Sequence, residues 1–181
     1  MVVSMTTDGA HRNPEGPGTE GAVSLAVALE REHREIDDGL ETFSAGGEGT
    51  EQRRQALERA IRALRRHIYL EEEFLFPPLR DAGLAAPVFV MLREHAQIWS
   101  TLDALEQEVR QGGSGLYRCR QLVVQLQHHN LKEERVLYPQ ADIVLTAPAA
   151  ERLRAFLETG ELPPGWVCQR YNPRPSDPQA Q

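Results

Sequence analysis

The sequence predicts an all-α protein, an up-down-up-down four-helix bundle of two repeated helical hairpins followed by a short C-terminal helix. Four long segments place apolar residues at alternating spacings of three and four, which is the period of a helix with one buried face. The first half of this region recurs in the second half at a constant offset. No alternating apolar pattern of a β-strand competes with the helical one.

The expected helices are bounded by residues that interrupt a helical backbone. They are predicted at about residues 22–43, 51–76, 86–111 and 114–138. Glycine pairs at 46–47 and 112–113 and a proline pair at 77–78 separate them. A shorter helix follows, with Thr146 as its N-cap and Gly160 beyond its end. Short connections favour antiparallel neighbours, as in an up-and-down bundle.

The two ends of the chain differ in composition from the helical part. Residues 1–21 are rich in Gly, Pro, Thr and Asn, and we expect a disordered leader there. The bundle is expected over residues 22–145, and the short helix with a proline-rich tail over residues 146–181. Two aromatic residues and a valine within residues 165–171 predict that this part of the tail docks on the bundle.

Charge and composition exclude several classes of partner. The formal net charge of −7, from 27 acidic and 20 basic residues, argues against a nucleic-acid partner. No apolar run approaches the length of a bilayer span and no signal peptide is recognised, so we expect no membrane partner. Two cysteines cannot make a disulfide framework, which favours reduced thiols in a cytoplasmic protein.

The internal repeat has an offset of 62 residues. The motif Arg-Glu-His at residues 31–33 recurs at 93–95, and His67 recurs as His129. Each of the latter two histidines has Glu at the fourth and fifth positions after it and an aromatic residue followed by proline further on. Two copies of one hairpin can pack with approximate two-fold symmetry, so repeat-related residues are expected to face each other across the core.

Six polar residues interrupt or flank the apolar stripes at positions related by this repeat. They are His33, His67, Glu71, His95, His129 and Glu133. A carboxylate in a bundle core costs on the order of several kcal/mol unless something compensates it, and no Lys or Arg lies in these stripes. Four imidazoles and a cation would compensate it. The alternative is a hydrogen-bonded His–Glu network without metal, which the repetition of all six residues disfavours.

The donor set favours a pair of metal ions. Two carboxylates and four imidazoles suit two borderline divalent cations, whereas one zinc would use four donors and leave two buried groups over. Two ferrous ions and two bridging glutamates would leave a site charge of about +2. Open positions would remain for water, hydroxide, dioxygen or nitric oxide.

This pattern resembles the hemerythrin-like, or HHE cation-binding, family over about residues 24–140. The resemblance implies a non-haem di-iron centre with an oxo or hydroxo bridge, in which the six residues have fixed roles. By resemblance, His33 and His67 serve one iron, His95 and His129 serve the other, and Glu71 and Glu133 bridge the two.

The chain departs from the oxygen-carrying members of that family at one position. Those members have a fifth histidine four residues after the one on the third helix, where this chain has Trp99. Trp99 either covers the metal pocket or packs in the core. Asp37 occupies the repeat-related position, as an extra ligand or a solvated acid. Glu72, Glu73 and Glu134 are expected to be exposed or to contact the ligands from outside.

The site resembles the four-histidine members of the family rather than the respiratory carrier. Its His-rich ligation leaves more positive charge than a carboxylate-rich di-iron site, which argues against strongly oxidising chemistry and favours binding of dioxygen or nitric oxide for sensing, detoxification or storage. The alternatives are a di-iron oxidase or peroxidase-like enzyme acting on peroxide, and an iron-handling or iron-donor protein. The expected ligand is therefore a small diatomic molecule or peroxide. A protein partner is not specified, and either a monomer or a homodimer is compatible with the sequence.

Overall fold

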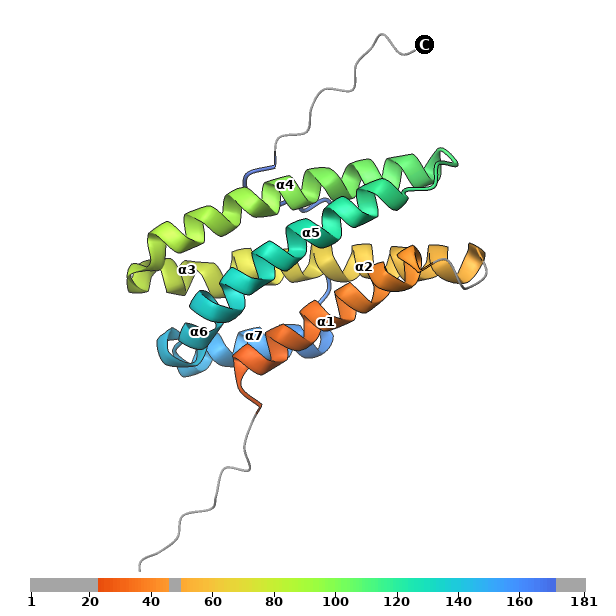
Figure 1. Ribbon diagram of the computed structural model, residues 1–181. Coiled ribbons are helices and arrows are strands. Elements are labelled where there is room, and N and C mark those ends of the chain that lie inside the picture. The colour runs from red at the N-terminus through yellow and green to blue at the C-terminus, as the bar shows by residue number, and fades with distance from the viewer. Residues whose placement is uncertain (1–22, 46–49, 172–181) are drawn as a thin grey trace, which may run out of the picture.

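The computed structural model describes residues 23–45 and 50–171, and these are helical apart from short connections and the tail at residues 160–171 (Figure 1). Within these ranges there is no strand, which confirms the predicted all-α class. The expected leader, residues 1–21, lies outside the described residues. So does the end of the tail, residues 172–181.

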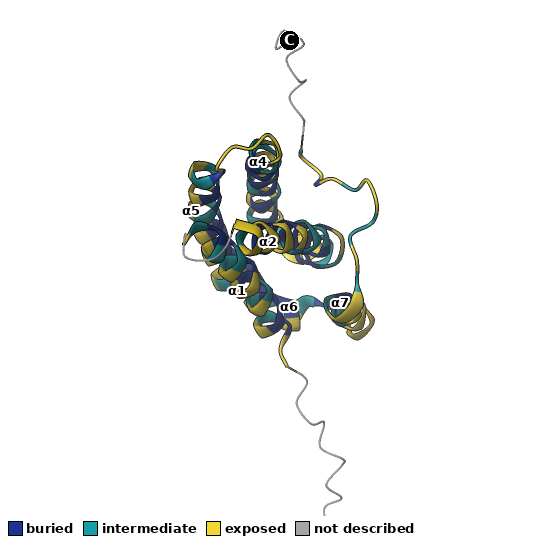
Figure 2. Cartoon of the chain, turned by 90° about the vertical axis from the view of Figure 1, so that its right-hand side faces the viewer, coloured by how far each residue is buried: buried dark blue, intermediate teal, exposed yellow. Residues whose placement is uncertain are grey.

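Four long helices form the body of the molecule. They are α1 (Leu25–Ser44), α2 (Thr50–Leu70), α4 (Ala85–Arg110) and α5 (Leu116–Lys132). The helices of each predicted hairpin lie side by side, α1 against α2 and α4 against α5. Figure 2 shows all four nearly end-on, with α7 (Ala147–Thr159) beside them.

The start of α1 shows how local chemistry sets a helix boundary. The Ser24 hydroxyl accepts a hydrogen bond from the Val27 backbone N–H at 3.2 Å, which satisfies one of the free donors of the first turn. Beyond this cap, the buried residues recur at spacings of three and four, as the sequence predicted: Leu25, Ala28, Leu29, His33, Ile36, Leu40 and Phe43.

The predicted break at the proline pair 77–78 is wrong, because the chain stays helical through it. A π-helical turn, η1 (Glu71–Leu75), follows α2 directly and leads into α3 (Phe76–Leu79) and a second π-helical turn, η2 (Arg80–Leu84). The Phe76 N–H bonds the Glu71 carbonyl, five residues back. This wider turn accommodates prolines that an α-helix interior would reject. The reversal into α4 occurs instead at Gly83, whose φ of 100° favours glycine.

The second half repeats this deviation. A π-helical turn, η3 (Glu133–Leu137), joins α5 to α6 (Tyr138–Val144), and the Tyr138 N–H bonds the Glu133 carbonyl. The fourth helical run therefore continues past the predicted end at residue 138. The turns η1 and η3 each begin at one of the two candidate bridging glutamates. Such turns are rare within helices and frequently mark functional sites.

Two apolar clusters lie on either side of the candidate residues along the bundle. The first cluster includes Ile36, Ile61, Ile98 and Leu126, and the second includes Leu29, Leu75, Met91 and Leu137. On each long helix the candidate histidine falls between residues of the two clusters. The polar residues thus form one layer enclosed by apolar layers, where water is excluded and unpaired polar atoms are costly.

The tail crosses the outside of the body, as the sequence predicted for residues 165–171. After α7 the chain runs past α2 toward α4 (Figure 2). Cys168 is buried, and Trp166 and Tyr171 pack against the first cluster. Arg66 anchors the beginning of this segment, because its guanidinium donates to the Gly160 carbonyl at 2.7 Å.

One stretch meets a composition test that the sequence prediction did not anticipate. Within the helical run Thr50–Arg110, a window with a hydropathy of 1.3 is long and apolar enough to cross a membrane. That run is not one straight helix, because the backbone reverses at Gly83 and α2 packs against α4. A single such window is weak evidence for a membrane span, and 28% of this window is buried within the protein.

Candidate metal centre

The six residues singled out from the sequence meet in one buried layer. Their ligand atoms form two groups, and within each group all atoms lie within 4.8 Å of one another. The first group consists of His33, His67, Glu71 and Glu133, and the second group of Glu71, His95, His129 and Glu133. Both glutamates belong to both groups, so the groups lie side by side. None of the six residues is more than 4% exposed.

Each shared glutamate directs one oxygen toward each group. Glu71 Oε1 lies 3.6 Å from His67 Nε2, and Glu71 Oε2 lies 3.2 Å from His95 Nε2. Glu133 divides its oxygens in the same way, at 3.5 and 3.0 Å from one histidine Nε2 of each group. A carboxylate that bridges two cations needs this orientation. All four imidazoles therefore turn Nε2 toward the centre and Nδ1 away from it.

Four further carboxylates hold the histidines from outside. The pairs are His33 with Glu134, His67 with Glu32, His95 with Glu72 and His129 with Glu94, with Nδ1-to-oxygen distances of 2.9 to 3.0 Å. A carboxylate beside Nδ1 keeps the proton on that nitrogen and leaves the Nε2 lone pair free for a cation. It also fixes the orientation of the ring. The whole set obeys the 62-residue repeat.

Sequence reasoning identified half of these outer carboxylates. Glu72 and Glu134 were expected to be exposed or to contact the ligands, and they contact the ligands. Glu32 and Glu94 were missed, although each precedes a candidate histidine in the repeated Arg-Glu-His motif. Each bonds not its neighbour in sequence but a histidine on the adjacent helix, and this pairing depends on packing between helices.

The outer carboxylates change the charge balance expected from the ligands alone. Arg66 pairs with Glu32 and Lys132 pairs with Glu94, whereas Glu72 is buried and accepts the Gln169 N–H at 2.8 Å. Two divalent cations and these two basic side chains would carry six positive charges. The two inner carboxylates, Glu71 and Glu133, and the four outer carboxylates carry six negative charges. The expected site charge of about +2 is therefore reduced to near zero once the surroundings are counted.

In the metal-free protein the site carries paired imidazolium and carboxylate groups. Burial opposes the charged form of His67, but Glu71 and Glu32 outweigh burial and raise the pKa of His67 to about 10. The same balance raises the pKa of His129 to about 10. Burial also opposes the carboxylate of Glu71, but His67 and His95 hold its pKa well below the usual value. A cation would replace the Nε2 protons.

Three polar atoms of the second group fit a cation better than they fit the protein alone. Glu71 Oε2, His95 Nε2 and Glu133 Oε1 are buried and have no hydrogen-bond partner among the described residues. They are held instead at ion-pair distance, Glu71 Oε2 at 3.2 Å from His95 Nε2 and Glu133 Oε1 at 3.0 Å from His129 Nε2. They converge where a cation bound by the second group would lie. The donor set and these atoms without hydrogen bonds together fit a metal ion.

Tyr138 is a site residue that sequence reasoning missed. Its hydroxyl is completely buried and donates to Glu71 Oε1 at 2.7 Å. The Tyr138 hydroxyl oxygen also lies 2.8 Å from His33 Nε2 and 3.1 Å from His67 Nε2. The signal was present, because an aromatic residue occupies this position in both copies of the repeat, but only the second copy has tyrosine. Tyr138 thus brings a hydroxyl into the first group.

A comparison with protein families finds that the model of the hemerythrin HHE cation-binding domain matches residues 24–141. The chain belongs to the hemerythrin HHE cation-binding family. The matched range contains both groups of the metal centre, whereas α7 and the tail lie beyond the end of this HHE domain. Comparison with curated proteins and with solved structures found no match.

Trp99 supports the tail of this HHE protein. Its ring centroid lies 5.5 Å from that of Trp166 and 6.2 Å from that of Tyr171, both in the tail. The guanidinium of Arg65 lies 5.4 Å from the Trp99 ring. Of the two alternatives left open by the sequence, these contacts favour packing over a cover for the metal pocket. The difference from the oxygen carriers at this position is thus linked to the tail.

The other polar neighbours of the HHE centre have outer positions. Asp37 is half-buried and belongs to neither group, and burial raises the pKa of its carboxyl. His128, adjacent to a candidate ligand, is exposed. The Glu73 carboxylate accepts from Trp166 Nε1 at 3.3 Å and so holds the tail rather than a histidine. Glu72, which follows Glu71, therefore contacts a candidate ligand, whereas Glu73 contacts the tail.

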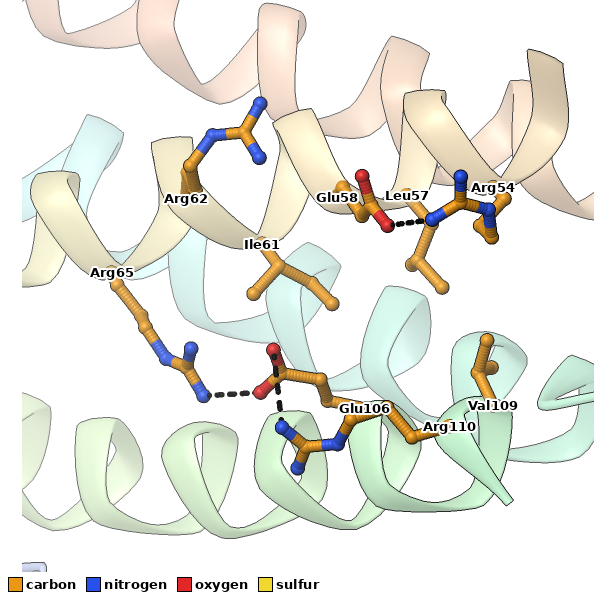
Figure 3. A pocket seen from close by; sticks show the side chains of 9 residues that line it. All are labelled: Arg54, Leu57, Glu58, Ile61, Arg62, Arg65, Glu106, Val109 and Arg110. Carbon is orange, nitrogen blue, oxygen red and sulfur yellow. Dashed lines mark hydrogen bonds and ion pairs between the residues drawn. The ribbon is translucent and has the colours of Figure 1, made fainter. Parts of the chain in front are cut away.

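A surface hollow of about 550 Å³ lies between α2 and α4, away from the HHE centre. Figure 3 shows that its basic side chains are largely paired within it. Glu106 receives both Arg65 and Arg110, and Arg54 pairs with Glu58. The two glutamates offset half of the charge of the four arginines that line the hollow, Arg54, Arg62, Arg65 and Arg110.

Proposed function

We propose that this protein is a non-haem di-iron protein that binds dioxygen or nitric oxide at its four-His, two-Glu centre. The observation that carries the proposal is the division of each glutamate's oxygens between the two groups. It supports two cations lying side by side with two carboxylate bridges. Imidazole and carboxylate donors in this ratio suit iron among the abundant divalent metals.

A bound pair of ferrous ions supplies exchangeable coordination positions and reversible one-electron chemistry. The protein contributes orientation, because every histidine is held by an outer carboxylate. It also contributes exclusion, because the centre lies between two apolar clusters. Residues buried to this degree admit only a small ligand, which favours a neutral diatomic molecule over an organic substrate.

A peroxidase-like activity is the second candidate function, and Tyr138 favours it. Turnover of peroxide requires a proton for the leaving oxygen, and the Tyr138 hydroxyl is a proton donor inside the centre. The near-neutral charge of the surroundings also weakens the argument, based on the ligands alone, that the centre is too positive for oxidising chemistry. Reversible binding remains the proposal because the burial of the centre supports it directly.

The test is anaerobic reconstitution of the full chain with ferrous iron, followed by elemental analysis. We expect two irons per chain, and a reversible spectral change when dioxygen or nitric oxide is added. Continuous consumption of added peroxide, without a stable adduct, would favour the enzyme instead. A preparation grown with iron that holds one zinc and no iron would contradict the di-iron proposal.

Matched substitutions test whether the iron binds in the predicted centre. His129→Ala removes a candidate ligand, whereas His128→Ala changes the adjacent exposed histidine. We expect His129→Ala to lose at least one iron and His128→Ala to keep both. Equal iron content in the two variants would place the metal elsewhere.

A further inference from the structure

The approximate symmetry of the two halves is broken at one pair of aromatic residues. Phe76 and Tyr138 are related by the 62-residue repeat, and each directly follows a π-helical turn. The Phe76 ring stacks on that of His95, with centroids 5.3 Å apart and planes at 20°. The Tyr138 ring lies 5.3 Å from that of His33. Equivalent rings thus contact opposite groups, and only one carries a hydroxyl.

That hydroxyl satisfies the polar atoms of the first group. Tyr138 Oη lies between 2.7 and 3.4 Å from one atom each of His33, His67, Glu71 and Glu133. In this arrangement it occupies the point on which the ligand atoms converge. The hydroxyl has one proton, which it donates to Glu71 Oε1, and its oxygen can accept from the Nε2–H groups of His33 and His67. A cation needs the same point and the same Glu71 oxygen. Tyr138 therefore competes with a cation for the first group.

The second group has no such competitor. Three of its buried atoms, Glu71 Oε2, His95 Nε2 and Glu133 Oε1, make no hydrogen bond with the described residues and are held at ion-pair distance. Phe76 contributes only a ring face there. A cation that binds at the second group replaces imidazole protons, whereas one that binds at the first group must in addition displace the hydrogen bonds of the Tyr138 hydroxyl.

We infer that Tyr138 makes the two cation positions unequal, so that the second group fills first and the first group fills only after the tyrosine hydroxyl has moved aside. Because it rests on the proposed two-cation centre, this order deepens that function by naming the residue that sets it. A cation that binds at the first group displaces several hydrogen bonds between the Tyr138 hydroxyl and charged groups. Its affinity is accordingly lower, on the order of tenfold to a hundredfold.

The difference between Tyr138 and Phe76 would also give the two bound metals different surroundings. The metal at the first position has a phenol beside it that can donate a hydrogen bond to a small bound ligand. The metal at the second position has only the Phe76 ring and the histidines around it. A di-cation centre that looks symmetric in its ligands is therefore asymmetric in its pocket.

The experiment is a titration of the metal-free full chain with Co²⁺, followed by calorimetry and by the visible absorption of the bound ion. We expect two binding steps that differ by about tenfold or more. Tyr138→Phe should strengthen the weaker step and leave the stronger one unchanged, so that the steps merge. Tyr117→Phe, which changes an exposed tyrosine of α5, serves as the matched control and should behave as the parent chain.

Two further variants test which group fills first. His67→Ala removes a ligand of the first group and should keep the strong step, whereas the repeat-related His129→Ala should lose it. Phe76→Tyr should weaken the strong step if it folds, which circular dichroism reports. Because Tyr138→Phe removes a single oxygen atom, the conclusion does not depend on the bulkier change.

The outcomes separate this inference from the proposed function. Binding of fewer than two Co²⁺ ions by the parent chain would contradict both the two-cation centre and the inference that rests on it. Two steps that stay unchanged in Tyr138→Phe would leave the centre standing and overturn the role of Tyr138. A weaker first position in Tyr138→Phe would also overturn it, because the phenol would then be a ligand and not a competitor.

Discussion

Glu72 connects three parts of the molecule that lie far apart in the sequence. It follows Glu71, a candidate bridging ligand, at the start of η1, and its Oε1 lies 2.9 Å from Nδ1 of His95 on α4. Its other oxygen accepts the backbone N–H of Gln169 in the tail at 2.8 Å. It is 1% exposed, and within residues 23–45 and 50–171 these two partners hydrogen-bond its buried carboxylate. Glu72 thus links the segment of Glu71, the candidate ligand His95 and the tail.

Substitution of Glu72 tests this connection. Glu72→Gln keeps the shape but removes the charge that favours the Nδ1 proton of His95, so metal binding at the second group should weaken about 10- to 100-fold. Glu73→Gln makes the same change one residue further on, at an exposed position, and should leave metal binding unaltered. Calorimetric titration with Co²⁺ measures both. Unaltered affinity in Glu72→Gln would show that the outer carboxylate does not act on the metal.

The π-helical turns explain how consecutive residues can both serve the site. Adjacent residues of an α-helix point about 100° apart, so Glu71 and Glu72 would not ordinarily both face the same buried layer. The extra residue in the turn changes the phase of the helix at this point. Glu133 and Glu134 do the same in η3. The same wide turns admit Pro77 and Pro139, which explains why the prolines do not end the helices.

The tail supplies a backbone hydrogen-bond donor, the Gln169 N–H, to the Glu72 carboxylate. Gln169→Pro removes the N–H that Glu72 accepts, whereas Gln169→Ala keeps it and removes only the side chain. We expect Gln169→Pro to lower the thermal midpoint and to weaken Co²⁺ binding at the second group, by up to about tenfold for one hydrogen bond to a charged group. Gln169→Ala should bind as the parent does. Similar metal binding in both variants would make the tail a packing element with no effect on the centre.

The layered arrangement of the whole molecule predicts that metal stabilises the fold. Six inner and outer carboxylates surround one layer between two apolar clusters, and in the metal-free protein only protons and two basic side chains balance them. A ligand present at 100 times its dissociation constant adds about 2.7 kcal/mol to the free energy of unfolding. Removal of metal by a chelator should therefore lower the thermal midpoint of the full chain.

Differential scanning calorimetry with and without chelator measures this shift. His129→Ala provides the control, because a variant that has lost a ligand should respond less to the chelator. An identical thermal midpoint for the parent chain in both conditions would support the alternative considered from the sequence, a hydrogen-bonded His–Glu network that needs no metal.

The helical class, the HHE family and the meeting of the six candidate residues could all be anticipated from the sequence. The reason is that a helix reports its buried face through its period, so His33 or Glu71 in an apolar stripe has to lie inside. The repeat then places the equivalent residues of two hairpins opposite one another. The places where the helices end were less predictable, since Pro77 is compatible with a π-helical turn that local sequence rules do not describe.

Periodicity and repetition thus determined which residues face the centre, because both are properties of a single helix or hairpin. Only the tertiary structure decided which atoms meet there. Glu32 bonds a histidine on the neighbouring helix, and Trp99 turns toward the tail. Tyr138 places a hydroxyl where its counterpart Phe76 offers only a ring. Such contacts depend on the packing of several helices at once, and the pattern along one helix does not contain that information.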